Sequence, residues 1–251
     1  MNVRLKCLSP RPMAALRLLC LPFAGAGAAA FRGWADALPA HVEAYAVQLP
    51  GREGRSSDTA LTCWETMLDS LLSAVDALHP QPTAIFGHSL GAVVGFELAR
   101  ALQQRGGPRV VHLFVSARPW PGIESDPLEP LWSADDEALL SAMDRRFGSL
   151  DTSLSHPDIR DVVLPALRAD LRLLDDYRYA PGVPLRCPVT AFAGAADPST
   201  PVEAVSAWRN ATSTAFDLHT VPGGHFFIES HKAELVAAVA ARLPAPTRPG
   251  W

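Results

Sequence analysis

Short apolar runs alternate along the chain with longer segments in which apolar residues recur at helical spacing. Runs of this length, several of them bounded by Gly, Pro or Asp, are typical of strands buried on both faces of a largely parallel sheet. The predicted strands are Leu16–Leu21, Ala44–Leu49, Thr83–Phe86, Val110–Ser116, Val189–Ala193 and Phe216–Val221.

The segments between these runs predict helices. They are Thr62–Leu78, Leu90–Arg105, Val202–Asn210 and Glu229–Leu243. Strands that alternate with helices indicate an α/β fold with a mostly parallel central sheet and flanking helices. A length of 251 residues suits a single domain of this class.

The stretch from about 125 to 184 interrupts the alternation. Ser133 begins an S-x-x-D cap pattern before a predicted helix that runs to about Phe147, and Gly148 can end that helix. A second helix is predicted from the spacing of Leu164, Leu167, Leu171 and Leu174. We expect a helical lid over the active end of the sheet, and a packed insertion without a gating role is the alternative.

Composition excludes two broad classes of function. The formal net charge is −4 and Lys and Arg form no dense run, so no nucleic-acid surface is expected. No apolar stretch approaches the roughly 18 residues that span a bilayer, so no membrane segment is expected. The four cysteines are scattered without metal-ligand spacing, which favours reduced thiols in a cytoplasmic protein.

The stretch 16–30 permits a second interpretation. It follows several basic residues and ends in small ones, as a secretory signal does. Its apolar run is short, however, and Pro22 follows immediately. We therefore favour a buried first strand that leads into a glycine-containing loop.

The segment Gly87–Gly91 has the sequence GHSLG, directly after a predicted strand and directly before a predicted helix. This is the context of a nucleophile elbow, in which small flanking residues permit a tight turn that exposes the serine hydroxyl. Ser89 is thus the predicted nucleophile. The alternative is an ordinary turn whose serine only caps the helix.

A serine hydroxyl needs a base to take its proton, and in this fold the base follows the serine and the acid along the chain. His225 fits best, because it follows a Pro-Gly-Gly loop after the last predicted strand. His219 lies inside the strand pattern and is expected to be structural. His231 lies two residues into a helix pattern and is expected to face solvent.

Asp197 is the predicted orienting acid. It lies in a loop after the strand Val189–Ala193 and just before a predicted helix. An Asp-Pro pair is also common where a turn leads into a helix, and Asp197 can serve in both capacities. Asp217, inside the following strand, is the weaker candidate.

The tetrahedral intermediate of acyl transfer needs hydrogen-bond donors for its oxyanion. One predicted donor is the backbone N–H of Leu90, next to the nucleophile. The second is expected in the loop 22–27, whose small residues let a backbone approach the substrate closely. Either Phe23 or Ala24 would supply that amide.

The sequence also resembles the type II thioesterases that work beside polyketide and nonribosomal peptide synthases. The matching blocks are LCLPFAGAGAAAFRGW (19–34), VQLPGREGR (47–55), FGHSLGAVVGFELAR (86–100), LRADLRLLDDYRY (167–179), FAGAADP (192–198) and VPGGHFFI (221–228). The blocks span nearly the whole chain, and the PGR and LRAD blocks are far more specific than the elbow. Ala26 departs from the pattern, since the family usually has a glycine there.

The resemblance implies a free-standing enzyme of the α/β-hydrolase fold that hydrolyses misloaded or short acyl groups from the phosphopantetheine arm of carrier proteins. No metal or organic cofactor is implied, and we expect a monomer. Two alternatives stay open: a small-molecule carboxylesterase or lipase-like hydrolase, and a catalytically silent binding protein on the same fold.

The lid is where specificity is expected to arise. If its apolar stripe roofs the space above Ser89, bulky lid residues would limit the length of the acyl group. The candidates are Leu131, Trp132, Met143 and Phe147.

Overall fold

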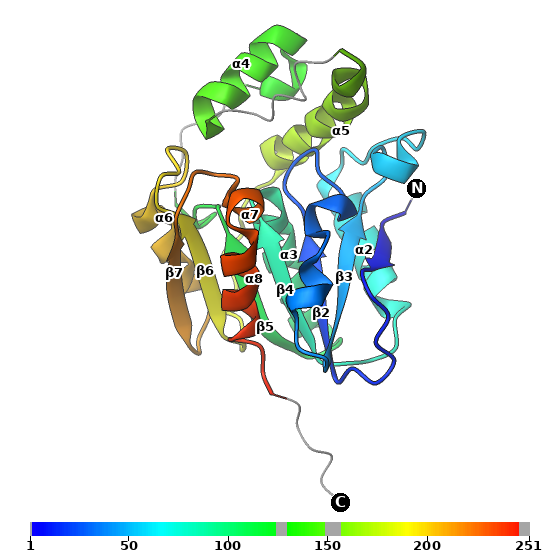
Figure 1. The fold of residues 1–251 in the computed structure, drawn as a ribbon, viewed down its shortest axis with the longest axis vertical. Helices are drawn as coiled ribbons and strands as arrows, with labels where there is room; N and C mark the ends of the chain where they lie inside the picture. The colour runs from blue at the N-terminus through cyan, green and yellow to red at the C-terminus, as the bar shows by residue number, and fades with distance from the viewer. Residues whose placement is uncertain (1, 124–129, 149–156, 246–251) are drawn as a thin grey trace, which may run out of the picture.

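A sheet of seven strands forms the centre of the computed structural model, which describes residues 2–123, 130–148 and 157–245 (Figure 1). The strand order is β1-β3-β2-β4-β5-β6-β7. All neighbouring strands are parallel except β1, which pairs antiparallel with β3. The strands are β1 (Arg4–Cys7), β2 (Leu16–Leu21), β3 (Val42–Gln48), β4 (Thr83–His88), β5 (Val110–Ser116), β6 (Val189–Gly194) and β7 (Phe216–Val221).

The six strands predicted from apolar runs are confirmed, and the prediction of an α/β fold with a mostly parallel sheet is confirmed with them. Strand β1 was missed. It has only four residues at the edge of the sheet, none of them buried, so it carries no apolar run.

Alternating residues of each central strand supply two separate cores. Leu19 and Ile85 point into a core shared with α2 (Trp64–Asp76) and α3 (Leu90–Gln104). Leu18 and Phe86 point into a core on the opposite face, shared with α1 (Trp34–Ala37) and α8 (Lys232–Ala240). Because both faces are covered, the central strands are mostly apolar on both faces, as expected for a parallel sheet.

Two predicted helices are divided. The segment Val202–Asn210 forms α6 (Val202–Ser206) and then a 3₁₀ helix, Ala207–Ala211. The predicted helix Glu229–Leu243 is interrupted at His231, where the backbone adopts φ −125° and ψ 34° between α7 (Phe227–Ser230) and α8. The apolar periodicity continues across the break, so the sequence pattern did not reveal it.

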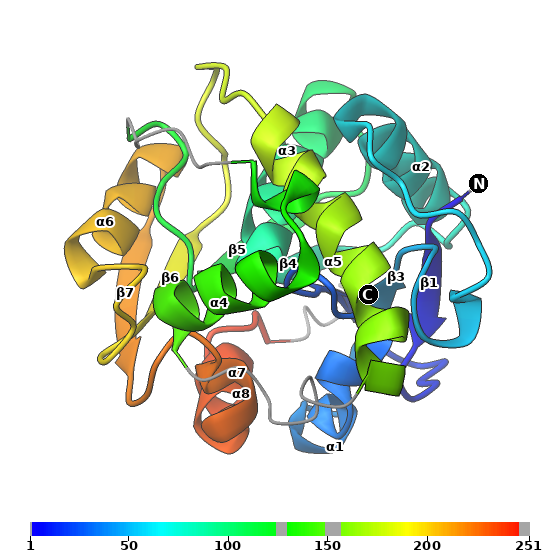
Figure 2. The ribbon, with the colours of Figure 1, turned by 90° about the horizontal axis from the view of Figure 1, so that it is seen from above.

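The helices α4 (Asp136–Phe147) and α5 (Pro157–Asp176) belong to the predicted lid, between β5 and β6. They lie over the edge of the sheet that carries the loops after β2 and β7 (Figure 1), and seen from above α4 crosses the sheet (Figure 2). The expected start of the lid near residue 125 lies outside the described residues.

The caps of α4 differ in part from the prediction. Its N-cap is Asp135, whose carboxylate accepts the Ala138 N–H at 2.8 Å, and Ser133 instead belongs to a short 3₁₀ helix, Leu131–Ser133. A carboxylate at this position satisfies a free N–H group and also favours the helix dipole. Gly148 ends the helix as predicted, with φ +79°.

In the part of the chain that the structure describes, no helix has the length and apolarity that crossing a membrane requires.

Candidate active site

Ser89 occupies a sharp turn between β4 and α3, with φ +54°, a conformation that costs a non-glycine residue energy. The turn is so tight that a Cβ atom on Gly87 would lie 2.0 Å from the Gly91 carbonyl oxygen, and one on Gly91 would lie 2.2 Å from that of Leu21. Ser89 makes no side-chain hydrogen bond to the helix N-terminus. The elbow prediction is confirmed in geometry, and the helix-cap alternative is wrong.

The side chains of Ser89, His225 and Asp197 form a hydrogen-bonded chain. Ser89 Oγ lies 3.2 Å from His225 Nε2, and His225 Nδ1 lies 2.8 Å from Asp197 Oδ2. All three residues are buried. This is the arrangement of a Ser–His–Asp triad, in which the carboxylate orients the imidazole and the imidazole accepts the hydroxyl proton.

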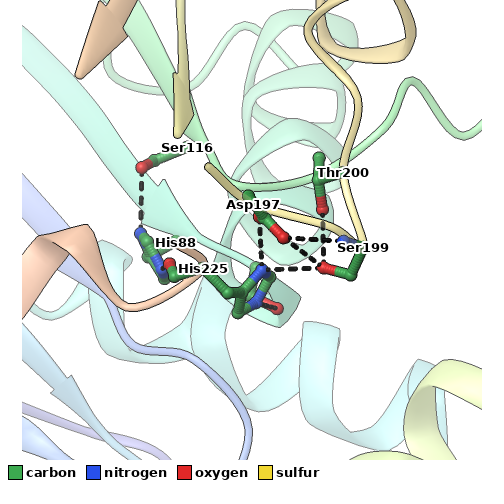
Figure 3. A network of polar contacts seen from close by, with 7 residues as sticks. His88, Ser116, Asp197, Ser199, Thr200 and His225 are labelled. Atoms are coloured by element: carbon green, nitrogen blue, oxygen red, sulfur yellow. Dashed lines mark hydrogen bonds and ion pairs between the residues drawn. The ribbon is translucent and has the colours of Figure 1, made fainter. Parts of the chain in front are cut away.

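Asp197 is held in its ionised form by its neighbours. Burial raises the pKa of its carboxyl, but hydrogen bonds and charge interaction with His225, together with hydrogen bonds from Ser199, outweigh burial and leave the pKa below its usual value. The Ser199 N–H and hydroxyl both donate to Asp197 Oδ1, at 2.9 and 2.6 Å (Figure 3). The other oxygen is therefore left for His225.

His88, which precedes the nucleophile, contacts the loop of the catalytic histidine. Its Nε2 lies 3.0 Å from the His225 carbonyl oxygen and its Nδ1 lies 2.9 Å from Ser116 Oγ (Figure 3). Burial lowers the pKa of His88 well below its usual value, so the ring is neutral. Its Nε2–H then donates to His225, and its Nδ1 accepts from Ser116.

His88 precedes the serine along the chain, so the rule that the base follows the nucleophile gives it no role. The only signal for its role was its place beside Ser89, inside the elbow. Ser199 was also missed, since a serine two residues after an aspartate is an ordinary turn feature.

The competing residues lie elsewhere. His231 is half-buried and its Nδ1 lies 2.9 Å from Ser230 Oγ, so it is less exposed than expected. His219 packs its ring edge-on against Phe192 in the strand region. Asp217 forms an ion pair with Arg242 at 2.6 Å. None of these side chains has a described contact with Ser89.

The loop 22–27 follows β2, the strand beside β4, and approaches the elbow closely. Gly25 has φ +80° and the Ala26 N–H donates to the Phe23 carbonyl at 3.1 Å, so the loop makes a tight turn. The positive φ that needs glycine is at Gly25. Ala26 does not have one, which explains why alanine is accommodated at the position where the family usually has glycine.

Three of the four predicted lid residues, Leu131, Met143 and Phe147, share one apolar cluster, and Trp132 lies apart from it. The Phe147 ring lies over the His225 ring, with centroids 4.4 Å apart. Met143 is buried in a lid cluster with Leu139, Leu164 and Leu167, and Leu131 and Ala24 of the loop 22–27 pack against this cluster.

Trp132 faces α5 instead. Its Nε1 donates to Asp175 Oδ2 at 3.0 Å, and the Arg172 guanidinium lies 5.1 Å from the centre of its ring. No described contact joins it to the triad. Among residues 2–123, 130–148 and 157–245, no cluster of three or more His, Cys, Asp or Glu side chains could hold a metal ion.

Comparison with known proteins agrees with this geometry. The sequence profile of the thioesterase domain family matches residues 16–243. The thioesterase PikA5 of Streptomyces venezuelae is 38% identical over 235 residues, which cover 93% of this chain and 83% of PikA5.

Two solved structures are similar over nearly their whole length. RedJ, a thioesterase of the prodiginine pathway in Streptomyces coelicolor, gives a TM-score of 0.85 at 37% identity and covers 93% of this chain and 88% of its own. The type II thioesterase BorB of the borrelidin cluster gives 0.84 at 33% identity, with 95% and 96% covered. The chain, with its Ser–His–Asp triad on an α/β-hydrolase fold, therefore belongs to the thioesterase domain family.

Proposed function

We propose that this protein is a type II thioesterase that removes aberrant or short acyl groups from the phosphopantetheine arm of carrier proteins. The observation that supports this best is the Ser89–His225–Asp197 triad in a chain of the thioesterase domain family, whose solved neighbours include type II thioesterases of NRPS/PKS biosynthetic pathways. Its partners are acyl or peptidyl carrier domains, and its product is a free phosphopantetheine thiol ready for reloading.

In the acylation step, Ser89 Oγ attacks the thioester carbonyl carbon while His225 Nε2 takes the hydroxyl proton. The negative charge that develops on the carbonyl oxygen is stabilised by the Leu90 N–H at the start of α3 and by an amide of Phe23 or Ala24. Collapse of the intermediate breaks the C–S bond, and the proton on His225 passes to the departing sulfur.

In the deacylation step, a water molecule gives a proton to His225 and attacks the acyl–Ser89 carbonyl. The second intermediate collapses, the acid departs, and the proton returns to Ser89 Oγ. Asp197 stays ionised throughout, since its carboxylate serves to orient and stabilise the imidazolium. The cycle needs no other reactant.

Phe147 supports the preference for short acyl groups. Its ring lies against His225 from the lid side, so a long chain bound at Ser89 must displace it or pass around it. Met143 and Leu131 support Phe147 in this role, because all three side chains belong to or pack against the lid cluster that contacts Ala24. Trp132 acts through α5, which it joins by its hydrogen bond to Asp175.

The enzyme is proposed to act as a monomer in the cytoplasm, beside the synthases. Cys7, Cys20, Cys63 and Cys187 are free thiols, which suits a reducing compartment.

The test compares a propionyl thioester on a carrier protein with a propionyl oxyester of matched size. We expect the carrier-bound thioester to be hydrolysed with the higher kcat/KM, and Ser89→Ala to be inactive on both. Preference for the oxyester would instead support a carboxylesterase. Failure of a fluorophosphonate probe to label Ser89 would support a silent binding protein.

A further inference from the structure

A buried ion pair between Arg52 and Asp170 lies directly behind the oxyanion loop. Arg52 Nη2 donates to Asp170 Oδ1 at 2.8 Å, and the side chains are 3% and 0% exposed. Both groups also bond to the loop itself. The Gly25 N–H donates to Asp170 Oδ2 at 2.8 Å, and Arg52 Nη1 donates to the Ala26 carbonyl at 3.1 Å.

These contacts hold the part of the loop that matters for catalysis. Because peptide units are planar, a fixed Gly25 N–H also fixes the orientation of the Ala24 carbonyl in the same unit. On the C-terminal side of Gly25, the hydrogen bond from Arg52 holds the Ala26 carbonyl. The turn that contains both candidate donor amides, those of Phe23 and Ala24, is therefore anchored by two charged groups.

The residues that follow the loop, in a 3₁₀ helix at Ala28–Phe31, have their own support. Gln48 Oε1 accepts the Ala28 N–H at 3.0 Å, and Glu53 Oε1 accepts the Ala29 N–H at 2.9 Å. Loss of the Arg52–Asp170 pair would therefore release residues 24–26 while the residues that follow stay held.

The three segments that meet here are far apart in the chain. Asp170 lies on the lid helix α5, Arg52 follows β3, and Gly25 follows β2. A Cβ atom on Gly25 would lie 3.3 Å from Leu167 Cβ, so α5 also packs closely on the turn. The C-terminal half of α5 is thus packed on the loop 22–27 and bonded to the segment that follows β3.

Energetics argue for a role beyond stability. Two buried charges lose their hydration, and a well-packed apolar pair of similar volume is often as stable or more stable. An apolar pair, however, could neither accept the Gly25 N–H nor donate to the Ala26 carbonyl. Only the charged pair can fix the orientation of the Gly25 N–H and the Ala26 carbonyl in the loop.

We propose that Arg52 and Asp170 are positioning residues for the second oxyanion donor, and that the lid helix α5 thereby takes part in transition-state stabilisation. The proposal rests on the oxyanion loop and triad described under the proposed function. It does not depend on which acyl group or carrier the enzyme uses.

The test separates positioning from stability with three variants: Asp170→Leu, Arg52→Met and the double variant. Each single variant leaves one charge buried without its partner and is expected to unfold at a lower temperature. The double variant removes both charges, so its melting temperature is expected to recover toward that of the wild type. Catalysis is expected to stay impaired, because the loop contacts are still missing.

Catalysis is measured with the propionyl thioester of N-acetylcysteamine, a small soluble substrate. Loss of a whole oxyanion donor costs about 10²–10³ in kcat, so a misdirected donor is expected to cost about ten- to hundredfold, with KM little changed. The affinity of a propyl trifluoromethyl ketone should fall in parallel. Its adduct forms when Ser89 Oγ adds to the carbonyl carbon and His225 takes the proton, leaving an oxyanion in the hole.

Arg55→Met is the matched control. Arg55 is a buried arginine three residues after Arg52, and it donates to the Asn2 carbonyl at 2.7 Å and to Asp58 at 2.8 Å. It also donates to the Gln48 carbonyl at 3.4 Å. None of these partners belongs to the loop 22–27. We expect this variant to lose stability but to bind the ketone as the wild type does.

A folded double variant with wild-type kcat and wild-type ketone affinity would overturn the proposal. If the double variant does not fold, Asp170→Asn decides instead. In the wild type, Asp170 Oδ2 accepts from both the Gly25 N–H and Arg52 Nη1, and Oδ1 accepts from Arg52 Nη2. An asparagine keeps the shape, but its NH2 group faces one of these donors, so the three hydrogen bonds cannot all be kept. Wild-type ketone affinity in Asp170→Asn would then overturn it. Failure on carrier-bound substrate alone would contradict the proposed function and leave this inference unaffected.

Discussion

His88 donates a hydrogen bond from Nε2 to the backbone carbonyl of His225, 3.0 Å away, and so ties the residue before the nucleophile to the residue that activates it. The two residues are separated by 137 positions in the chain. The elbow and the loop after β7 are thereby held as one unit, and the 3.2 Å separation of Ser89 Oγ and His225 Nε2 depends on both.

Replacement of His88 by leucine should therefore lower kcat about ten- to hundredfold with KM little changed, since the His225 loop loses its anchor. His112→Leu is the control: it removes another buried histidine that bonds a hydroxyl, that of Thr190 at 2.9 Å, but at a position with no described contact to the triad. Steady-state kinetics and melting temperatures on both variants check this. Equal losses of kcat would mean that His88 matters only for general packing.

The triad makes a graded prediction. Ser89→Ala should abolish turnover without unfolding the protein. Asp197→Asn should retain a residual rate, about 10⁴-fold below the wild type, because the nucleophile remains but the His225 tautomer is wrong. Measured kcat values and circular dichroism spectra test both, and a Ser89→Ala variant within tenfold of the wild type would exclude Ser89 as nucleophile.

The two late histidines should differ sharply. His225→Ala is expected to lower kcat by several orders of magnitude. His231→Ala is expected to cost little activity, since its ring contacts Ser230 at the break between α7 and α8. Turnover of the two purified variants decides this, and a reversed result would refute our assignment of the base.

The free energy of unfolding should decrease as the pH is lowered, over a pH range set by the buried histidines His112 and His88. Burial, with a smaller contribution from the nearby Arg242, lowers the pKa of His112 to about 4, and burial also lowers the pKa of His88. Because the unfolded chain binds these protons near the ordinary histidine pKa of about 6.5, their contribution is complete above that pH. It is lost progressively as the pH falls from about 6.5 toward 4.

Urea unfolding between pH 4.5 and 7.5 checks this window. The wild type should lose stability steadily below about pH 6.5, and His112→Gln should lose less, because one of the proton-binding groups is gone. Asp197 acts at lower pH: its folded pKa is depressed, so its contribution is present above its unfolded pKa of about 3.9 and lost below that. An identical pH dependence in the wild type and His112→Gln would contradict the assignment to His112.

The lid makes a prediction about chain length. Phe147→Ala removes the ring that lies against His225, so the optimum in a series of acetyl, propionyl, butyryl, octanoyl and palmitoyl thioesters should move to longer chains. Trp132→Ala should move it less, since Trp132 is bound to α5 through Asp175. The measurement is kcat/KM for the whole series on one carrier protein. A flat wild-type profile, or one that neither substitution moves, would mean that these residues do not set acyl length.

Local sequence determined much of this protein. The alternation of apolar runs and helical segments predicted the parallel sheet, because strands buried on both faces are mostly apolar along their length. The glycines around Ser89 predicted the elbow, because no larger residue fits so tight a turn. The order of serine, acid and histidine then selected Asp197 and His225.

Only the tertiary structure decided which distant residues support these groups. His88 reaches the loop of His225, and Arg52 and Asp170, 118 residues apart, meet behind the oxyanion turn. The blocks 47–55 and 167–179, which contain Arg52 and Asp170, are specific to the family that the sequence resembles. Neither hydrophobic periodicity nor turn chemistry, however, can predict a contact between residues that far apart. Such pairing depends on which strands are neighbours and where the lid helix packs, and those long-range contacts arise only when the whole sheet has formed.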